Sequence, residues 1–332
     1  MKTFKYNLIL SLVIALVLGL TACSQSGEEA SGEAEFPKRP IELVIPFGEG
    51  GASDTFARKF AEIINKTSPE PLQPVNKSGS GGLVGMVYAE KQSNDGYTVL
   101  EITPSHVIND VLEQGKGVEL LEDFEPLIRV QSDIYILSVP ASSEIDSFEE
   151  LVEVGKEKPL TFAGISSGGL DDLTLNALAA ATGMQVKFIP YKSGSEVKAA
   201  VLGGEVDVYL DKIISAIGYI KDNKVKPLVI LNDERIKKVD ELKEIPTTVE
   251  LGYDVTIGSW RGFAVKKGTP ENTKEFLIEK MKEAYKTDEY KLFAEQNLVD
   301  IREGFLEPEE FKKQWAEEYK VFEEVAKKTG LK

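Results

Sequence analysis

A glycine-rich stretch early in the chain reads Pro46-Phe47-Gly48-Glu49-Gly50-Gly51-Ala52-Ser53-Asp54-Thr55-Phe56-Ala57-Arg58, directly after the apolar run 41–45. Apolar side chains then recur at Phe56, Phe60, Ile63 and Ile64, which is the spacing of one buried helix face. The stretch therefore predicts a strand, a glycine loop and a helix. Glycine lets the backbone pass close to a guest molecule, and N–H groups at a helix start can hold an anion. The other interpretation is a plain β-α turn that needs glycine for its geometry.

The same arrangement is predicted at two further places. A glycine-rich turn at 77–85 opens a helix, and the strand Leu160 to Ala163 leads into Gly164-Ile165-Ser166-Ser167-Gly168-Gly169-Leu170-Asp171-Asp172. Between them, the strand 97–102 is followed by a predicted loop, Thr103 to His106. Successive units of this kind place their loops at one edge of a parallel sheet, where ligands of α/β proteins bind.

Length and charge limit the class of protein. A chain of 332 residues exceeds one hydrophobic core, so we expect two domains, and the strand-like runs 126–140 and 256–265 are suited to crossing between them. Lys and Arg total 39 against 55 Asp and Glu, a net charge of −16, which argues against nucleic acid or anionic lipid as a broad-surface partner. With one Cys and one His and no EF-hand spacing, we expect no metal site, no cofactor and no internal disulfide.

The N-terminus has the pattern of a bacterial lipoprotein. Two lysines precede an apolar run, Leu8 to Leu20, which ends in Leu20-Thr21-Ala22-Cys23 and resembles a lipobox. We therefore expect a signal peptide at 1–22, cleavage before Cys23 and lipid attachment to that cysteine. Residues 23–35 contain no apolar run and read as a flexible tether. The expected location is extracytoplasmic, with the lipid holding the chain to the bacterial membrane.

Two enzyme motifs match in part. Gly48-x-Gly50 with Ser53 is a near miss to the dinucleotide fingerprint, and the next strand ends in Asn76 rather than an acid. Gly164-x-Ser166-x-Gly168 matches the nucleophile elbow of hydrolases, but that fold needs its His after the Ser, and the single His is His106. A secreted serine hydrolase using Ser166 or Ser167 remains as the alternative from another class.

Several single residues allow two interpretations. Asp54 could contact a ligand or merely cap a helix, and Trp260 and Tyr191 could be core aromatics or cleft walls. Asp211, at the end of the predicted strand 206–210, is the acid least readily explained by structure alone. A carboxylate placed there can bind hydroxyls, amines or bridging waters.

Taken together, the motifs resemble the Bug/TctC family of extracytoplasmic solute receptors, which serve tripartite tricarboxylate transporters. The resemblance extends from Phe36 to the C-terminus and rests on Pro46-Phe47-x-x-Gly50-Gly51-x-x-Asp54-x-x-Ala57-Arg58, Asn76-x-x-Gly79-x-Gly81-Gly82-x-x-Gly85, Asp95-Gly96-Tyr97-Thr98, Pro190-Tyr191-Lys192, Gly203-Gly204-x-Val206-Asp207 and Trp260-x-Gly262. It implies a type II periplasmic-binding-protein fold: an α/β Venus flytrap with two parallel-sheet, Rossmann-like lobes joined by two crossing strands. The implied lobes are 36–131 with 257–332, and 132–256.

The resemblance also implies a function. The expected protein is a non-enzymatic, monomeric receptor that closes on one small organic anion and hands it to membrane subunits. In the family, the loop matching 47–54 holds one carboxylate, and the loop matching 164–171 holds the other end, partly through water. The candidate ligand-binding residues are Phe47, Gly48, Glu49, Gly50, Gly51, Ala52, Ser53, Asp54, Ser105, His106, Ser166, Ser167, Gly168, Gly169, Leu170, Asp171, Tyr191 and Asp211.

Departures from the family pattern bear on the ligand. Where relatives often have a serine and a histidine, this chain has Leu170 and Asp172, and Glu49 replaces a proline or small residue. With Asp211, these acids would repel a highly charged tricarboxylate. We therefore expect a mono- or dicarboxylate, or a ligand that also carries an amine. A receptor that signals to a sensor kinase would have the same sequence features.

Overall fold

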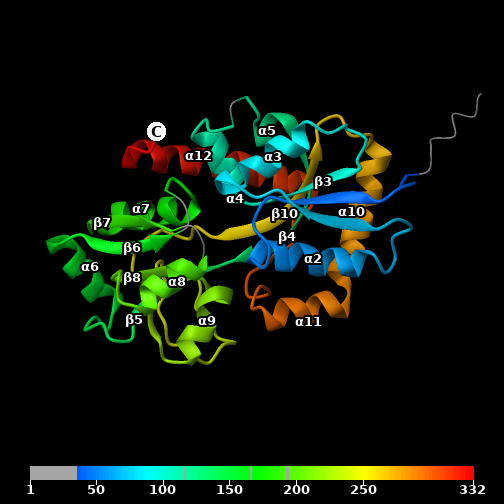
Figure 1. The fold of residues 1–332 in the computed structure, drawn as a ribbon. Helices are drawn as coiled ribbons and strands as arrows, with labels where there is room; N and C mark the ends of the chain where they lie inside the picture. Colours follow the sequence, from blue (N-terminus) through cyan, green and yellow to red (C-terminus); the bar gives the residue numbers. More distant parts are fainter. Residues whose placement is uncertain (1–35, 116, 165–166, 192–193) are drawn as a thin grey trace, which may run out of the picture. The chain divides into compact units, whose positions relative to one another are not determined.

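Two mixed sheets of five strands each form the framework of the folded chain (Figure 1). The computed structural model describes residues 36–115, 117–164, 167–191 and 194–332, and Pro37–Lys332 forms one compact unit. The predicted signal peptide 1–22, the tether 23–35 with Cys23, and Ser166 lie outside the described residues.

The glycine-rich stretch that begins at Pro46 directly follows a strand of the first sheet, β1 (Ile41–Ile45). In spatial order this sheet consists of β2 (Leu72–Asn76), β1, β3 (Thr98–Ile102), β10 (Ser259–Lys266) and β4 (Phe124–Asp133). β1 is parallel to β2 and β3, whereas β10 is antiparallel to β3 and β4. The helical segments that accompany these strands along the chain are α2 (Ala52–Ile64), η1 (Ser80–Gly82), α3 (Leu83–Glu90), α4 (Pro104–Val111), α5 (Leu120–Asp123), α10 (Glu271–Lys286), α11 (Asp288–Gln296) and α12 (Pro308–Thr329).

The second sheet repeats this plan. Its spatial order is β7 (Val186–Pro190), β6 (Leu160–Gly164), β8 (Val208–Lys212), β5 (Tyr135–Pro140) and β9 (Val225–Ile230). β6 is parallel to β7 and β8, and β5 is antiparallel to β8 and β9. Its helices are α6 (Phe148–Glu157), α7 (Leu170–Thr182), α8 (Gly194–Leu202) and α9 (Ile213–Lys221). The predicted two-lobed α/β fold is thereby confirmed, and each sheet with its helices is called a lobe below.

The chain passes between the two sheets at two adjacent places. β4 ends at Asp133 and β5 begins at Tyr135, so the predicted crossing run serves both sheets with one residue between them. The second passage leads into β10, whose first residue, Ser259, pairs with Asp133 of β4. Among the described strands, β10 pairs only with strands of the first sheet. The second crossing is therefore a strand in the first sheet but not in the second.

Burial of the predicted apolar faces places the helices on the sheets. The predicted face of α2 is buried, and the rings of Phe56 and Phe60 stack with Phe263 of β10 at centroid distances of 5.4 to 5.8 Å. Each buried phenylalanine contributes about 1.5–3 kcal/mol by removing its side chain from water. This packing fixes the start of α2, and with it the glycine loop, against β10, which begins where the chain returns from the second sheet.

One local prediction is wrong. Residues 103–106 do not form a loop, because α4 begins at Pro104. Pro at the first helical position is favourable, and the Thr103 N–H lies 3.1 Å from His106 Nδ1. Ser105 and His106 therefore lie in the first turn of a helix.

Candidate functional site

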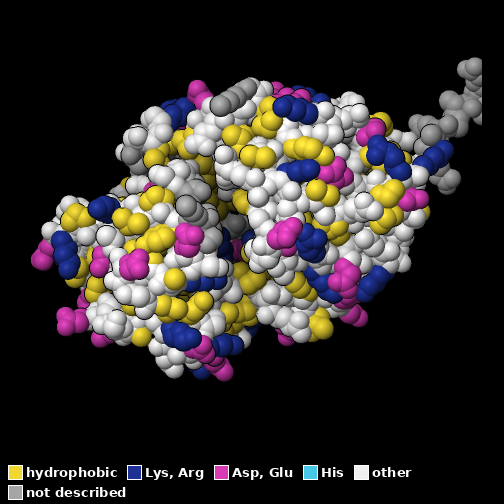
Figure 2. Space-filling view, in the orientation of Figure 1, with side chains coloured by type: hydrophobic (Ala, Val, Ile, Leu, Met, Phe, Trp, Pro, Cys, Tyr) yellow, Lys and Arg dark blue, Asp and Glu magenta, His cyan; other side chains and the backbone are white. Residues whose placement is uncertain are grey.

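A cavity of about 1010 Å³ lies between the two lobes. Its walls come from the loops after β1, β3, β6 and β8, together with the loop around η1 and the start of β10. Figure 2 shows the hollow on this face between the side that carries α2 and the side that carries α8. We predicted that these loops lie at one edge of a sheet, and in the structure the loops of both lobes line a common cavity. This cavity is called the cleft below.

The loop of the first lobe is held in shape by a buried carboxylate. Asp54 is 5% exposed and accepts the Gly50 N–H at 2.9 Å through Oδ2. Its Oδ1 accepts from Asn76 Nδ2 and Arg58 Nε, both at 2.8 Å. Burial alone would raise the pKa of Asp54, but the bonds from Gly50 and Asn76 and the Arg58 charge lower it overall. Gly50 has φ of +72°, a conformation that favours glycine.

The loop of the second lobe has the same construction. Asp172 Oδ2 accepts the Gly168 N–H at 2.7 Å, and its Oδ1 accepts from Asn176 Nδ2 at 2.9 Å. Gly168 has φ of +70°, and the glycine after it is an extended N-cap, as Gly51 is in the first loop. Asp172 is 4% exposed and, although its pKa is raised by burial, it faces its own loop. The acid that departs from the family pattern is therefore the counterpart of Asp54.

The remaining acids of the second lobe are paired with a lysine that the sequence did not reveal. Lys212 Nζ donates to Asp171 Oδ1 at 3.0 Å and lies 4.0 Å from Asp211 Oδ1. Asp171 Oδ1 also accepts from Tyr135 Oη at 2.5 Å, and Asp211 Oδ2 accepts from Tyr209 Oη at 2.8 Å. Burial disfavours the charged form of Lys212, but Asp171 and its other neighbours raise its pKa well above the ordinary value. Lys212 thus offsets one of the two carboxylate charges, and each carboxylate also accepts a tyrosine hydroxyl within its own lobe.

The floor of the cleft carries a buried arginine. Arg261 is 5% exposed; its Nη1 donates to Asp133 Oδ2 at 2.5 Å and its Nε to Ser53 Oγ at 3.2 Å. Glu101 Oε1 lies 3.8 Å from Arg261 Nε and is fully buried. Burial raises the pKa of Glu101 to about 8, although the arginine opposes this shift. Arg261 therefore links the first glycine loop, through Ser53, to the place where the chain crosses between lobes.

The predicted site residues divide into two groups. Those that line the cleft are Phe47, Gly48, Glu49, Gly50, Gly51, Ala52, Ser53, Ser105, Ser167, Gly168, Gly169, Leu170, Asp171 and Asp211. Asp54, His106 and Tyr191 do not line it, and Ser166 lies outside the described residues. Sequence reasoning missed the lining residues Ser78, Gly82, Asn109, Lys198, Lys212 and Arg261.

His106 has a structural position. It is fully buried behind Gly82, and burial lowers the pKa of its imidazole to about 4. Tyr191 is half-buried, and its hydroxyl lies 3.3 Å from Glu205 Oε2. Trp260 is buried on the opposite face of β10 from Arg261 and donates its indole N–H to Glu318 at 2.8 Å.

The described residues contain neither a cluster of metal ligands nor a helix that could span a membrane. Across 36–115, 117–164, 167–191 and 194–332, no group of three or more His, Cys, Asp or Glu residues is arranged to hold a metal ion. Over the same residues, no helix has both the length and the apolar character that a membrane span requires.

The fold and the cleft together define a two-lobed solute-binding protein. The model of the tripartite tricarboxylate transporter receptor family, TctC, matches residues 56–331, and the chain belongs to this family. Its members are receptors rather than enzymes. The protein BugT of Bordetella pertussis is 26% identical over 303 residues, which cover 90% of this chain and 91% of BugT.

Solved structures have the same fold. The periplasmic binding protein BugD is 25% identical, with a TM-score of 0.76 over 89% of this chain and 99% of BugD. Two Rhodopseudomonas palustris proteins, one with adipate and MatC with bound malate, are each 24% identical and have TM-scores of 0.78 and 0.75. Each match covers 99% of the R. palustris protein. It covers 89% of this chain for the protein with adipate and 87% for MatC.

Proposed function

We propose that this protein captures a small organic carboxylate outside the cytoplasm and delivers it to the membrane subunits of a tripartite tricarboxylate-type transporter. The observation that carries the proposal is the pair of matching loops, one per lobe, that face a common cleft. Each loop begins a helix at a glycine N-cap, so the first-turn N–H groups of α2 and α7 lie at the cleft. Helix N-termini favour negatively charged groups.

The charges of the cleft support a mono- or dicarboxylate. Lys212 offsets one of the two carboxylate charges of Asp171 and Asp211, and Asp133 offsets Arg261, so one uncompensated acid remains near the helix N-termini and disfavours a highly charged ligand. Lys198 lines the cleft as a further cation, and Glu49 as a further anion. A ligand that also carries an amine would place it near Glu49 or Asp171. The solved relatives with adipate and malate hold dicarboxylates, which agrees with this class.

The proposed motion is closure of the lobes about the two chain crossings. We assign residues 36–131 and 257–332 to one lobe and 132–256 to the other, with the pivot near the paired residues Asp133 and Ser259. The proposed location is extracytoplasmic, as for the periplasmic relatives, with a lipid on Cys23 and the segment 23–35 as the tether. The receptor is proposed to act as a monomer.

Isothermal titration with a panel of acids tests the ligand class. Succinate, malate, adipate, propionate, aspartate and citrate are titrated into the protein without its signal peptide. We expect a mono- or dicarboxylate to bind most tightly and citrate to bind at least tenfold more weakly. Tight binding of citrate, with none of the smaller acids or of aspartate, would contradict the proposal.

A further inference from the structure

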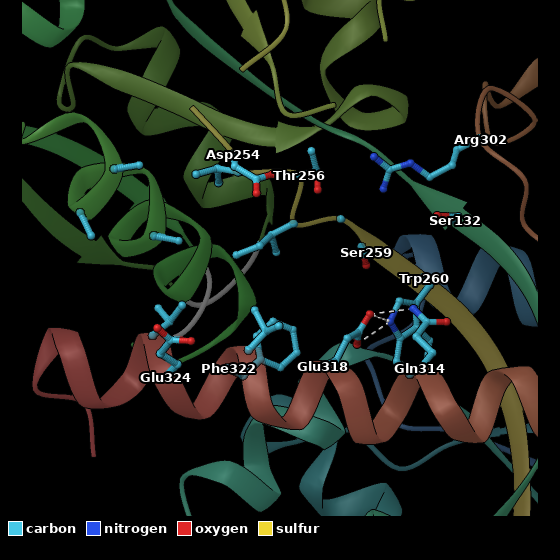
Figure 3. Close-up of a pocket in the computed structure, with 18 of the residues that line it drawn as sticks. Ser132, Asp254, Thr256, Ser259, Trp260, Arg302, Gln314, Glu318, Phe322 and Glu324 are labelled. Carbon is cyan, nitrogen blue, oxygen red and sulfur yellow. Dashed lines mark hydrogen bonds between the residues drawn. The ribbon is translucent and has the colours of Figure 1, made fainter. Parts of the chain in front are cut away.

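A second cavity, of about 550 Å³, lies on the far side of β10 from the cleft. Trp260 lines it, whereas the next residue, Arg261, lines the cleft, because neighbouring side chains of a strand point to opposite faces. Figure 3 shows this hollow bounded by α12, by α7 and by the segment 254–260. It is called the rear cavity below.

One wall of the rear cavity is apolar. Ala177, Ala180 and Ala181 of α7 face it from one lobe, and Val321, Phe322 and Val325 of α12 face it from the other. Val321 is 49% exposed, so part of this apolar wall is in contact with water. An apolar group of a ligand would remove this surface from water, and the volume lies within the range of small-molecule pockets.

At the polar end of the rear cavity, the guanidinium of Arg302 can bind an anionic group of a ligand. Arg302 donates through Nη2 to Asn232 Oδ1, and within the described part of the chain no carboxylate lies within ion-pair distance of it. Burial lowers the pKa of Arg302, although Asp233 opposes this shift. Figure 3 shows its nitrogens directed toward Thr256 at the edge of the hollow. Asp233 acts on Arg302 only from beyond ion-pair distance, so a ligand carboxylate in direct contact would further offset the cost of burying the guanidinium.

The other charged groups in the rear cavity are already engaged or exposed. Arg129 donates to the Gly304 and Glu303 carbonyl oxygens and to Gln314 Oε1. Glu318 accepts from Trp260 Nε1 at 2.8 Å and from Gln314 Nε2 at 2.7 Å, and burial raises its pKa to about 7. Glu324 pairs with Lys328, and Asp254 is exposed at the rim. Arg302 is therefore the group left to recognise an anion.

We propose that the rear cavity binds an amphiphilic monoanion, a carboxylate on an apolar chain or ring. The apolar body lies between α7 and α12, and the carboxylate binds Arg302 with the Thr256 hydroxyl beside it. Among the described residues the rear cavity and the cleft share Ser259 alone as a lining residue, and this proposal does not depend on the ligand proposed for the cleft.

Octanoate is the probe for the test, because it combines an unbranched alkyl chain with one carboxylate. Titration calorimetry measures its binding, and tryptophan fluorescence reports on the site, because Trp260 is one of two tryptophans. Three variants separate the two cavities. Ala181→Trp fills the rear cavity from an exposed position, Arg302→Met removes the cation, and Ala52→Trp fills the cleft from an exposed position.

We expect octanoate to bind the wild-type protein and Ala52→Trp alike, to bind Arg302→Met at least tenfold more weakly, and not to bind Ala181→Trp. Arg302→Lys should keep part of the affinity, and octanol should bind more weakly than octanoate. If Arg302→Met does not fold, octanoate binding to Ala181→Trp and Arg302→Lys still tests the proposal. The proposal is overturned if octanoate does not bind the wild type, or if Ala52→Trp abolishes binding while Ala181→Trp preserves it.

Discussion

At the scale of single residues, two aspartates determine the shape of the binding loops without lining the cleft. Asp54 and Asp172 each accept the N–H of a glycine four residues earlier and an asparagine amide. The difference lies in the third partner, because only Asp54 forms an ion pair, with Arg58. The first loop therefore depends on charge, whereas the second loop relies on neutral donors.

Substituting these acids should weaken ligand binding unequally. Asp54→Asn removes the ion pair with Arg58. Its amide NH2 group would also face another donor, either the Gly50 N–H or the Arg58 guanidinium. Hydrogen bonds to charged groups contribute about 1.5–3 kcal/mol, so we expect at least a tenfold loss of affinity for the tightest acid of the titration panel. Asp172→Asn should lose less, since the Asn176 amide can rotate to match it. Calorimetry measures both, with the exposed Glu279→Gln as the control. Unchanged affinity in Asp54→Asn would contradict this interpretation of the loop.

At the scale of elements, one glycine forms the junction between the short helix η1 and α3, as the last residue of η1 and the N-cap of α3. Gly82 has φ of +95°, and a Cβ there would lie 2.9 Å from His106 Nε2 and 3.4 Å from Phe47 Cζ. Both neighbours are tied to the first lobe: His106 is fully buried in α4, and Phe47 packs edge to face against it. The loop that lines the cleft therefore rests on a histidine.

Gly82→Ala should destabilise the protein more than the matched substitution Gly204→Ala. Gly204 has a similar φ of +70°, but a Cβ added there would meet no atom within 4 Å. Backbone strain alone costs about 1–2 kcal/mol, and the collision with His106 adds about 1–3 kcal/mol at Gly82. Urea denaturation measures both. Equal losses in the two variants would show that His106 yields to the added methyl group.

The elements were easier to predict from the sequence than the directions of their side chains. The units built around a glycine loop, such as β1 with α2 and β6 with α7, are signalled locally by an apolar run and by the glycines after it, and they were found in order, whereas the loop predicted at 103–106 was wrong. The facing of Asp54, Asp172 and His106 depends on partners elsewhere in the fold, and it was not predictable from local pattern. The sequence contained a weak sign of the role of Arg261, because it is a charged residue directly after Trp260 in a strand that is otherwise largely apolar. Lys212 had none, because its partner Asp171 is 41 positions away.

At the scale of the whole molecule, buried ionisable groups give stability a pH dependence. Burial raises the pKa of Glu101 to about 8 and that of Asp110 to about 7. Such acids stabilise the fold fully below their unfolded pKa of about 4.5 or less, and this contribution is lost as pH rises through 7 to 8. His106 has the opposite effect: its pKa of about 4 makes stability fall as pH drops from about 6.5 to 4.

Glu101→Gln should flatten the alkaline side of this profile. The free energy of unfolding of the wild type is expected to fall between pH 5 and pH 9, and the variant should lose less over the same range. Arg261 keeps Asp133 as its partner, so the substitution leaves no cation unpaired. Urea unfolding at pH 5, 7 and 9 measures the difference. An equal slope in both proteins would mean that Glu101 does not hold its proton in the folded state.

The strand order of the first sheet also sets which part of the chain must be present before this lobe can be completed. β10 is inserted between β3 and β4, and it is the one neighbour that β4 has among the described strands. A nascent chain that has emerged only as far as residue 250 holds every strand of the second sheet, yet its first sheet is missing the strand that joins β4 to the rest. The half of the molecule that begins first in the sequence is therefore the half that is completed last, because its sheet is not continuous until β10, which ends at Lys266, is in place.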